Sequence, residues 1–130
     1  MIPNERLGIK ERLEEAIGQT SRVTPCRSIA VARRDGLVIV HRLEPGRNPQ
    51  QAAAMAAAVL GAATSVAKEL SQGEVERVII ECSEGKIVAL NAGPDAIILA
   101  LYDHQANLGL ALHGLVQTAH TIDELLEELR

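Results

Sequence analysis

Four histidines are the side chains of this 130-residue sequence best suited to binding a metal. His113 and His120 lie seven positions apart, which places them on one face of a helix. A protein metal site needs three or four ligands, and neither His41 nor His104 lies at a spacing that completes one. We therefore expect no metal site and interpret the histidines as exposed or partly buried side chains.

Two cysteines, Cys26 and Cys82, are the next candidates for chemistry. Neither belongs to a CxxC pair, and neither has histidines nearby at zinc-binding spacing. In a reducing compartment such residues are mostly buried thiols, which is what we expect here. A disulfide or a reactive thiol is the alternative interpretation.

Sequence motifs for catalysis and for nucleotide binding are absent. The chain contains no GxxxxGK[ST] phosphate loop, no GxGxxG, no HExxH and no GxSxG. We expect a protein without catalytic residues or a cofactor, and therefore not an enzyme.

Composition and charge narrow the class of protein further. Hydrophobic residues make up 47% of the chain but aromatic residues only 1%, so the core must consist of Val, Ile, Leu and Ala. The first 47 residues carry nine basic and six acidic side chains, yet the whole chain has a net charge of −4. With almost no aromatic ring for bases to stack on, we expect no nucleic-acid binding. The length suits a single domain over residues 1–130.

Neither the first residues nor the Ala-rich segment predicts a membrane protein. The opening "MIPNERLGIKERLEE" reaches charged residues at once, unlike a signal peptide. The uncharged stretch after Arg47 has an apolar centre of only twelve residues, 52–63, which is typical of a buried soluble helix. We expect a cytoplasmic protein with no membrane partner.

Periodicity and turn residues predict helix, two strands, helix, three strands and helix. The first helix covers residues 5–17 and ends at Gly18, and "CRSIAVARRDGLVIVHRL" forms a hairpin around Asp35-Gly36. Asn48 caps the Ala-rich helix, Pro49 opens it, Gln51 completes the capping-box pattern, and Gly73 stops it. The strands "VERVIIEC", "KIVALNA" and "DAIILALY" follow, and then a helix over 107–129. The alternative to one continuous last helix is two helices with a break near His120.

The predicted strands are apolar at successive positions, for example Val78-Ile79-Ile80 and Ile97-Ile98-Leu99. Such strands indicate a sheet that is covered on both faces. The fold class is therefore α+β, with helices on either side of one sheet.

The hairpin "RRDGLVIVHRL", the Ala-rich helix, "VERVIIECSEGKIVALNAGPDAIILALY" and "NLGLALHGL" together resemble the roadblock/dynein light-chain family. The resemblance covers about residues 5–117 and indicates an MglB-like bacterial or archaeal member. It implies a five-stranded antiparallel sheet of order 2-1-5-4-3. It also implies dimers that pair their third strands and middle helices, and binding or regulation of small Ras-like GTPases. Bacterial members such as MglB act as GTPase-activating proteins.

The Ala-rich helix has two apolar faces on a helical wheel. We expect one stripe to face the sheet: Ala52, Met55, Val59, Ala62, Val66 and Leu70. The opposite face would then be an exposed apolar patch that meets a twin or a partner. With residues of the third strand, the predicted interface comprises Ala53, Ala57, Leu60, Gly61, Thr64, Val78 and Ile80. The alternative is that alanine is used here only as a good helix former.

Arg42 and Arg47 flank the loop before this helix and are candidates to face a partner. An arginine supplied in trans accelerates GTP hydrolysis, although the spacing here does not establish such a role. The predicted function is a dimeric, non-enzymatic regulator or adaptor of a GTPase, with GTPase activation as a further possibility. The alternative is a small-molecule-sensing or purely structural homodimer of the same fold.

Overall fold

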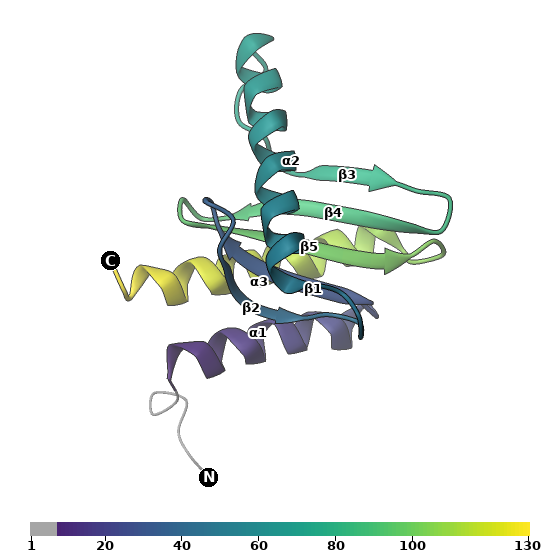
Figure 1. The fold of residues 1–130 in the computed structure, drawn as a ribbon, viewed down its shortest axis with the longest axis vertical. Helices are drawn as coiled ribbons and strands as arrows, with labels where there is room; N and C mark the ends of the chain where they lie inside the picture. The colour runs from purple at the N-terminus through teal and green to yellow at the C-terminus, as the bar shows by residue number, and fades with distance from the viewer. Residues whose placement is uncertain (1–7) are drawn as a thin grey trace.

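A five-stranded antiparallel sheet separates one long helix from two others (Figure 1). The computed structural model describes residues 8–130. Its elements are α1 Ile9–Val23, β1 Ser28–Arg33, β2 Val38–Arg42, α2 Pro49–Glu69, β3 Val78–Glu81, β4 Gly85–Ala92, β5 Ala96–Asp103 and α3 Leu108–Glu127. The strand order is β2-β1-β5-β4-β3, which confirms the predicted fold class and order.

The two faces of the sheet support cores of different character. The face covered by α1 and α3 buries large aliphatic side chains, among them Ile17, Ile98 and Leu115. The face covered by α2 buries mostly small ones: Ala32, Ala53, Ala56, Leu60, Ala89 and Ile97. Because alanine side chains are short, α2 lies close to the strands beneath it.

The hairpin predicted around Asp35-Gly36 is present. β1 and β2 pair antiparallel, with a bulge between Val31 and Ala32. Gly36 donates its N–H to the Arg33 carbonyl at 2.9 Å and has a φ of 91°, a value that favours glycine. A Cβ on Gly36 would lie 3.3 Å from the Cα of Ala54, so the turn also lies directly against α2.

The first helix does not end at Gly18, as the sequence predicted. α1 begins at Ile9 and continues to Val23, while residues 5–7 of the predicted helix lie outside the described residues. Gly18 is buried, and a Cβ there would lie 3.2 Å from an Arg42 guanidinium nitrogen. Glycine at this position therefore permits close packing. The helix ends instead where Thr24, which precedes Pro25, adopts an extended conformation.

α2 begins as predicted and ends earlier than predicted. The Asn48 side chain accepts a hydrogen bond from the Gln51 N–H, and Pro49 occupies the first helical position. At the other end the residue with a left-handed conformation is Ser71, with a φ of 54°, and not Gly73. The Ser71 N–H bonds the Lys68 carbonyl and the Gln72 N–H bonds the Ala67 carbonyl, which is a Schellman cap with serine in the usual glycine position.

The last helix is continuous. α3 runs from Leu108 to Glu127 and is capped by Asn107, whose side chain accepts from the Leu110 N–H. Thr121 donates its hydroxyl to the Gln117 carbonyl within the helix and does not cap a new one, so there is no break near His120.

Among the described residues, no helix combines the length and the apolar character that a membrane crossing requires.

Candidate interaction surface

α2 faces the sheet with a different side from the one predicted. Ala53, Ala56 and Leu60 are its buried residues. The predicted sheet-facing stripe points away from the core: Met55 is 55% exposed, Val66 58% and Leu70 62%. The prediction was wrong because it gave the bulkiest apolar stripe to the sheet, whereas the sheet packs against alanines. The largest side chains of this stripe are therefore exposed in the part of the chain that the structure describes.

A groove of about 470 Å³ runs along this exposed side, between the first half of α2 and the sheet. Its polar rim comes from Arg47, Asn48 and Gln51 at the start of the helix. Its apolar lining includes Met55, Val59, Ile80, Ile87, Leu99 and Leu101. We call this feature the α2 groove.

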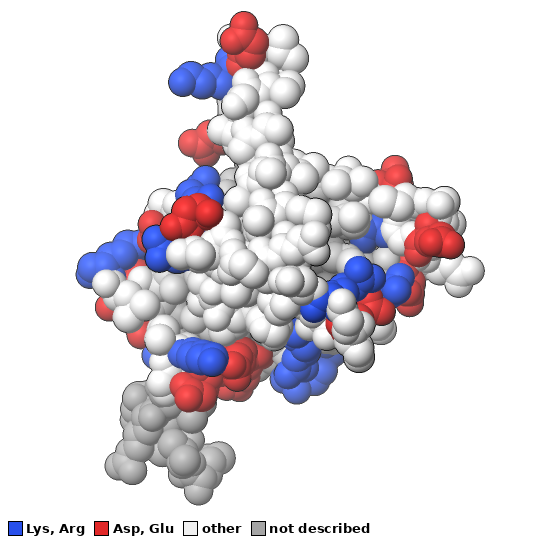
Figure 2. Space-filling view, in the orientation of Figure 1, with Lys and Arg blue, Asp and Glu red and all other residues white. Residues whose placement is uncertain are grey.

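Charged side chains avoid this face of the molecule. Figure 2 shows that the length of α2 is almost entirely free of Lys, Arg, Asp and Glu, which gather at its tip and around the margins. Beyond the sheet α2 continues as a projecting rod (Figure 1), and a Cβ on Gly61 would have no heavy atom within 4 Å. A contiguous apolar surface of this kind is typical of a protein–protein contact.

The edge strand next to the groove is also uncovered. β3 is the outermost strand on its side, and Ile79 and Ile80 are each 37% exposed. The sheet as a whole has helices on both faces, as predicted, but this edge is covered only in part: Val78 packs against the core under α2, while Ile79 and Ile80 are exposed. The other edge differs, since Gln50 of α2 accepts from the Val38 N–H of β2 and donates to the Gly36 carbonyl. An edge with free backbone groups is a site for strand pairing.

The structure divides the predicted interface residues into three groups. Ala53 and Leu60 are buried on the sheet-facing side of α2, so their assignment to an exposed face was wrong. Ala57 is half-buried, whereas Gly61 and Thr64 are exposed. The reason is that a four-residue step rotates around the helix by about 40°, so the row of small residues turns from the sheet into solvent. Of the two β3 residues, Ile80 lines the groove, whereas Val78 packs against the alanine core between α2 and the sheet.

Sequence reasoning missed several residues of the groove. Met55 and Val59 were placed against the sheet, and the contributions of Ile87, Leu99 and Leu101 were not identified. The apolar stripe of α2 was visible in the sequence, but its direction depends on which side packs better against β1, β4 and β5. That choice is a property of the assembled sheet.

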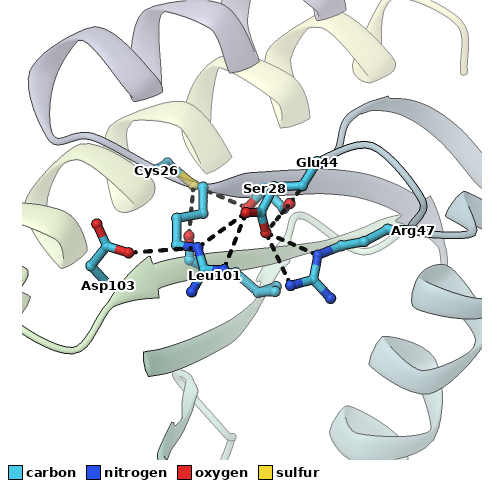
Figure 3. A network of polar contacts seen from close by, with 7 residues as sticks. Cys26, Ser28, Glu44, Arg47, Leu101 and Asp103 are labelled. Atoms are coloured by element: carbon cyan, nitrogen blue, oxygen red, sulfur yellow. Dashed lines mark hydrogen bonds and ion pairs between the residues drawn. The ribbon is translucent and has the colours of Figure 1, made fainter. Parts of the chain in front are cut away.

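A polar network holds the loop at the start of the groove (Figure 3). The Glu44 carboxylate pairs with Arg27 at 3.1 Å and with Arg47 at 3.0 Å. Ser28, which is fully buried, accepts a hydrogen bond from the Glu44 N–H at 3.0 Å. On its far side Arg27 lies 3.5 Å from Asp103. These contacts tie the loop before α2 to β1 and β5.

Two groups of this network have shifted pKa values. Hydrogen bonding from Arg47, with the charge and hydrogen bond of Arg27, lowers the pKa of the Glu44 carboxyl. Burial raises the pKa of the Cys26 thiol, which lies 3.0 Å from the Ser28 carbonyl oxygen. Glu44 is therefore an anion at neutral pH, and Cys26 is a protonated donor.

The two arginines predicted to face a partner lie apart. Arg47 lies on the rim of the α2 groove and is paired with Glu44. The Arg42 guanidinium lies over Gly18 of α1, on the opposite side of the sheet. Only Arg47 therefore lies beside the candidate surface.

The cysteines and histidines form no metal site among the described residues. Cys26 is partly buried, but Cys82 is exposed, which corrects the prediction of two buried thiols. Cys82 lies in the tight turn between β3 and β4, where its N–H bonds the Gly85 carbonyl and its side chain is exposed. Within residues 8–130, no group of three or more His, Cys, Asp and Glu side chains is arranged to hold a metal ion.

Solved structures with this fold are similar over nearly the whole chain. The gliding protein MglB of Thermus thermophilus has a TM-score of 0.84 at 21% identity, covering 94% of this chain and 93% of that one. MglB of Myxococcus xanthus has a TM-score of 0.87 at 14% identity, covering 100% and 96%. A further structure, described as MglB with a tetrameric arrangement, has a TM-score of 0.86 at 23% identity, covering 94% and 93%. At these identities the likeness establishes the fold alone.

Sequence comparisons give the family. Two uncharacterized proteins of Methanocaldococcus jannaschii, MJ0310 and MJ1340, are each 39% identical over 80 residues, or 62% of this chain and 69% of theirs. The Roadblock/LC7 domain model matches residues 12–102. Together with the sheet order and the three helices, this match shows that the chain belongs to the roadblock/LC7 family.

Proposed function

We propose that this protein is a homodimer that regulates, or serves as an adaptor for, a small Ras-like GTPase, without catalytic residues of its own. The observation that carries the proposal is the exposed apolar surface that α2 and the open edge of β3 form together. Family membership supports it, since the roadblock resemblance implies dimers and GTPase partners. The self-association of a similar protein, MglB in a tetrameric arrangement, is consistent with it.

The second copy is proposed to cover the α2 groove and the open edge of β3. Five large apolar side chains exposed on a single chain lie on these two elements or at their ends: Met55, Val66, Leu70, Ile79 and Ile80. Removing such side chains from water favours association, in opposition to the entropy that the two copies lose on binding. We include Ala57, Gly61 and Thr64 only as neighbours of this surface, because they face away from the groove.

A charge placed in the groove tests the dimer. Met55→Arg puts a guanidinium on the apolar lining, and since Met55 is exposed the fold should persist. We expect the dimer dissociation constant to rise by about a hundredfold or more, because an unpaired charge would be desolvated. Ala58→Arg is the matched control, since Ala58 is exposed and does not line the groove. Sedimentation analysis that found both variants equally dimeric would place the interface elsewhere.

We propose that the GTPase, when it carries GTP, binds to the assembled dimer. A pull-down from native lysate, with and without a non-hydrolysable GTP analogue, should enrich a protein that carries the phosphate-loop motif. The purified pair then allows a single-turnover hydrolysis assay, which separates an activator from an adaptor. A dimer that captures no such protein in either nucleotide state would favour the sensing or structural alternative.

The arginine beside the groove is not proposed as a catalytic group. Arg47 already pairs with Glu44 at 3.0 Å, so its guanidinium is engaged within its own chain. The cytoplasmic location and the single-domain extent over residues 1–130 stay predictions of the sequence.

A further inference from the structure

The open edge of β3 presents backbone groups from alternate residues. In the turn, Cys82 donates its N–H to the Gly85 carbonyl at 2.8 Å, which makes this pair a hydrogen-bonded one. Hydrogen-bonded and non-bonded pairs alternate along an antiparallel ladder, so Ile80 and Val78 also turn their backbone groups towards β4. The residues between them, Arg77, Ile79 and Glu81, turn their N–H and C=O groups to the open edge.

This alternation restricts how a second copy can pair. Two identical strands that pair antiparallel are related by a two-fold axis, and their open-edge residues must face one another. Because open-edge residues occur at every second position, they oppose one another only if the two-fold axis lies at the position of a residue. An axis midway between two residues would set open-edge residues of one copy opposite inward-facing residues of the other. The candidates for that residue are the positions of and beside β3: Arg77, Val78, Ile79, Ile80 and Glu81.

Charge distinguishes among these positions. An axis at Arg77 would place two arginines opposite each other, and an axis at Glu81 two glutamates, and both arrangements are unfavourable. An axis at Val78 or at Ile80 would set one of these charges opposite Ile79. An axis at Ile79 sets Arg77 opposite Glu81 twice, once on each side. Neither side chain has an ion pair within the described part of the chain.

An axis at Ile79 also places apolar side chains opposite each other on both faces of the paired strands. Val78, which packs against the alanine core under α2, then lies opposite Ile80, which lines the α2 groove. The apolar floor of the groove thereby continues into the second copy. On the other face Ile79, which pairs with Val88 of β4, meets its own twin.

We propose that β3 pairs with β3 of a second copy in the antiparallel register centred on Ile79, with Arg77 of each copy bound to Glu81 of the other. The inference rests on the proposed dimer and adds its register and its charge pairing. The two sheets then form one continuous sheet across the interface.

A cysteine scan reads the register directly. In a Cys82→Ser background, cysteines are placed singly at positions 77 to 81, and the protein is oxidised with copper phenanthroline. Only the residue on the axis faces its own twin, with Cα atoms about 5.5 Å apart in a hydrogen-bonded pair, which is within reach of a disulfide. We expect Ile79→Cys to cross-link most and Arg77→Cys and Glu81→Cys least. A maximum at Val78→Cys or Ile80→Cys would overturn the register.

Charge reversal tests the ion pairs independently. Arg77→Glu and Glu81→Arg should each raise the dimer dissociation constant by about tenfold, because like charges then face each other. The double variant should return the constant to within about threefold of the original. Two single effects that add in the double variant would show that the residues do not face each other.

The mass of the unmodified protein in solution distinguishes a failure of the proposed register from a failure of the proposed dimer. A dimer mass with no cross-link at any of the five positions would mean that the copies meet elsewhere, and only the register would fail. A monomer mass at high micromolar concentration would overturn the proposed dimer, and the register with it.

Discussion

At the scale of single residues, the two thiols differ in accessibility. Cys82 is exposed in the β3–β4 turn, whereas Cys26 is partly buried and burial raises its pKa. We expect one thiol per folded chain to react rapidly with Ellman's reagent at pH 8 and the second only after denaturation, since the thiolate is the reactive form. Cys82→Ser should remove the rapid phase. A rapid phase that survives this substitution would mean that Cys26 is accessible.

Glu44 should make the heat stability depend on pH. Its folded-state pKa is lowered, so its contribution to stability is present above the unfolded pKa and is lost as the pH falls through the folded one. We expect Glu44→Gln to melt below the original protein at pH 7, with the difference closing on acidification through that lowered pKa. Glu69→Gln is the control, because Glu69 is exposed and makes no ion pair within the described residues. A difference that stays constant down to acidic pH would assign the effect to packing.

At the scale of elements, the orientation of α2 on the sheet can be tested by enlarging a buried and an exposed alanine of the helix. Ala53 is fully buried, and its replacement by leucine would overpack the alanine core. We expect Ala53→Leu to lower the free energy of unfolding by about 1–3 kcal/mol in a urea titration. Ala62→Leu, at an exposed position of the same helix, should change it by less than about 0.5 kcal/mol. The reverse ranking would restore the orientation first predicted from the sequence.

The end of α2 carries a residue that is poorly suited to its conformation. Ser71 has a φ of 54°, where a residue with a Cβ is less stable than glycine by about 1 kcal/mol or more. We expect Ser71→Gly to slow amide hydrogen exchange in the last turn of α2, residues 66–70, by several-fold. Ser65→Gly, within the exposed helix, should accelerate it, because glycine there lowers helix propensity. Equal exchange in both variants would mean that the cap does not limit fraying.

The elements themselves were largely predictable from the sequence. Short turns such as "SEG" and "GP" leave neighbouring strands little choice but antiparallel pairing, and Asn48 with Pro49 fixes the start of α2. The site was less predictable. Periodicity identifies the apolar stripe of α2 but not the surface it meets, and Met55 was misplaced for that reason. The contact of Arg27 with Glu44 joins residues 17 positions apart, so it follows from the fold and from no local pattern.

At the scale of the whole molecule, the predicted absence of a nucleotide site is testable. No phosphate loop occurs in the sequence, so calorimetry with the purified protein should detect no GTP binding at micromolar concentrations. Any effect on GTP hydrolysis should then require a second protein. Micromolar binding to the protein alone would contradict this prediction and would require a search for a phosphate-binding site.

The projecting end of α2 has a consequence for the lifetime of the protein in a cell. The buried residues of α2 end at Leu60, and the helix continues beyond the sheet (Figure 1), so local opening there costs little free energy and exposes peptide bonds to proteases. A second chain lying across the helix would raise the cost of that opening. Degradation would then remove unassembled copies first, so that the amount of this protein in the cell follows the amount of whatever covers α2.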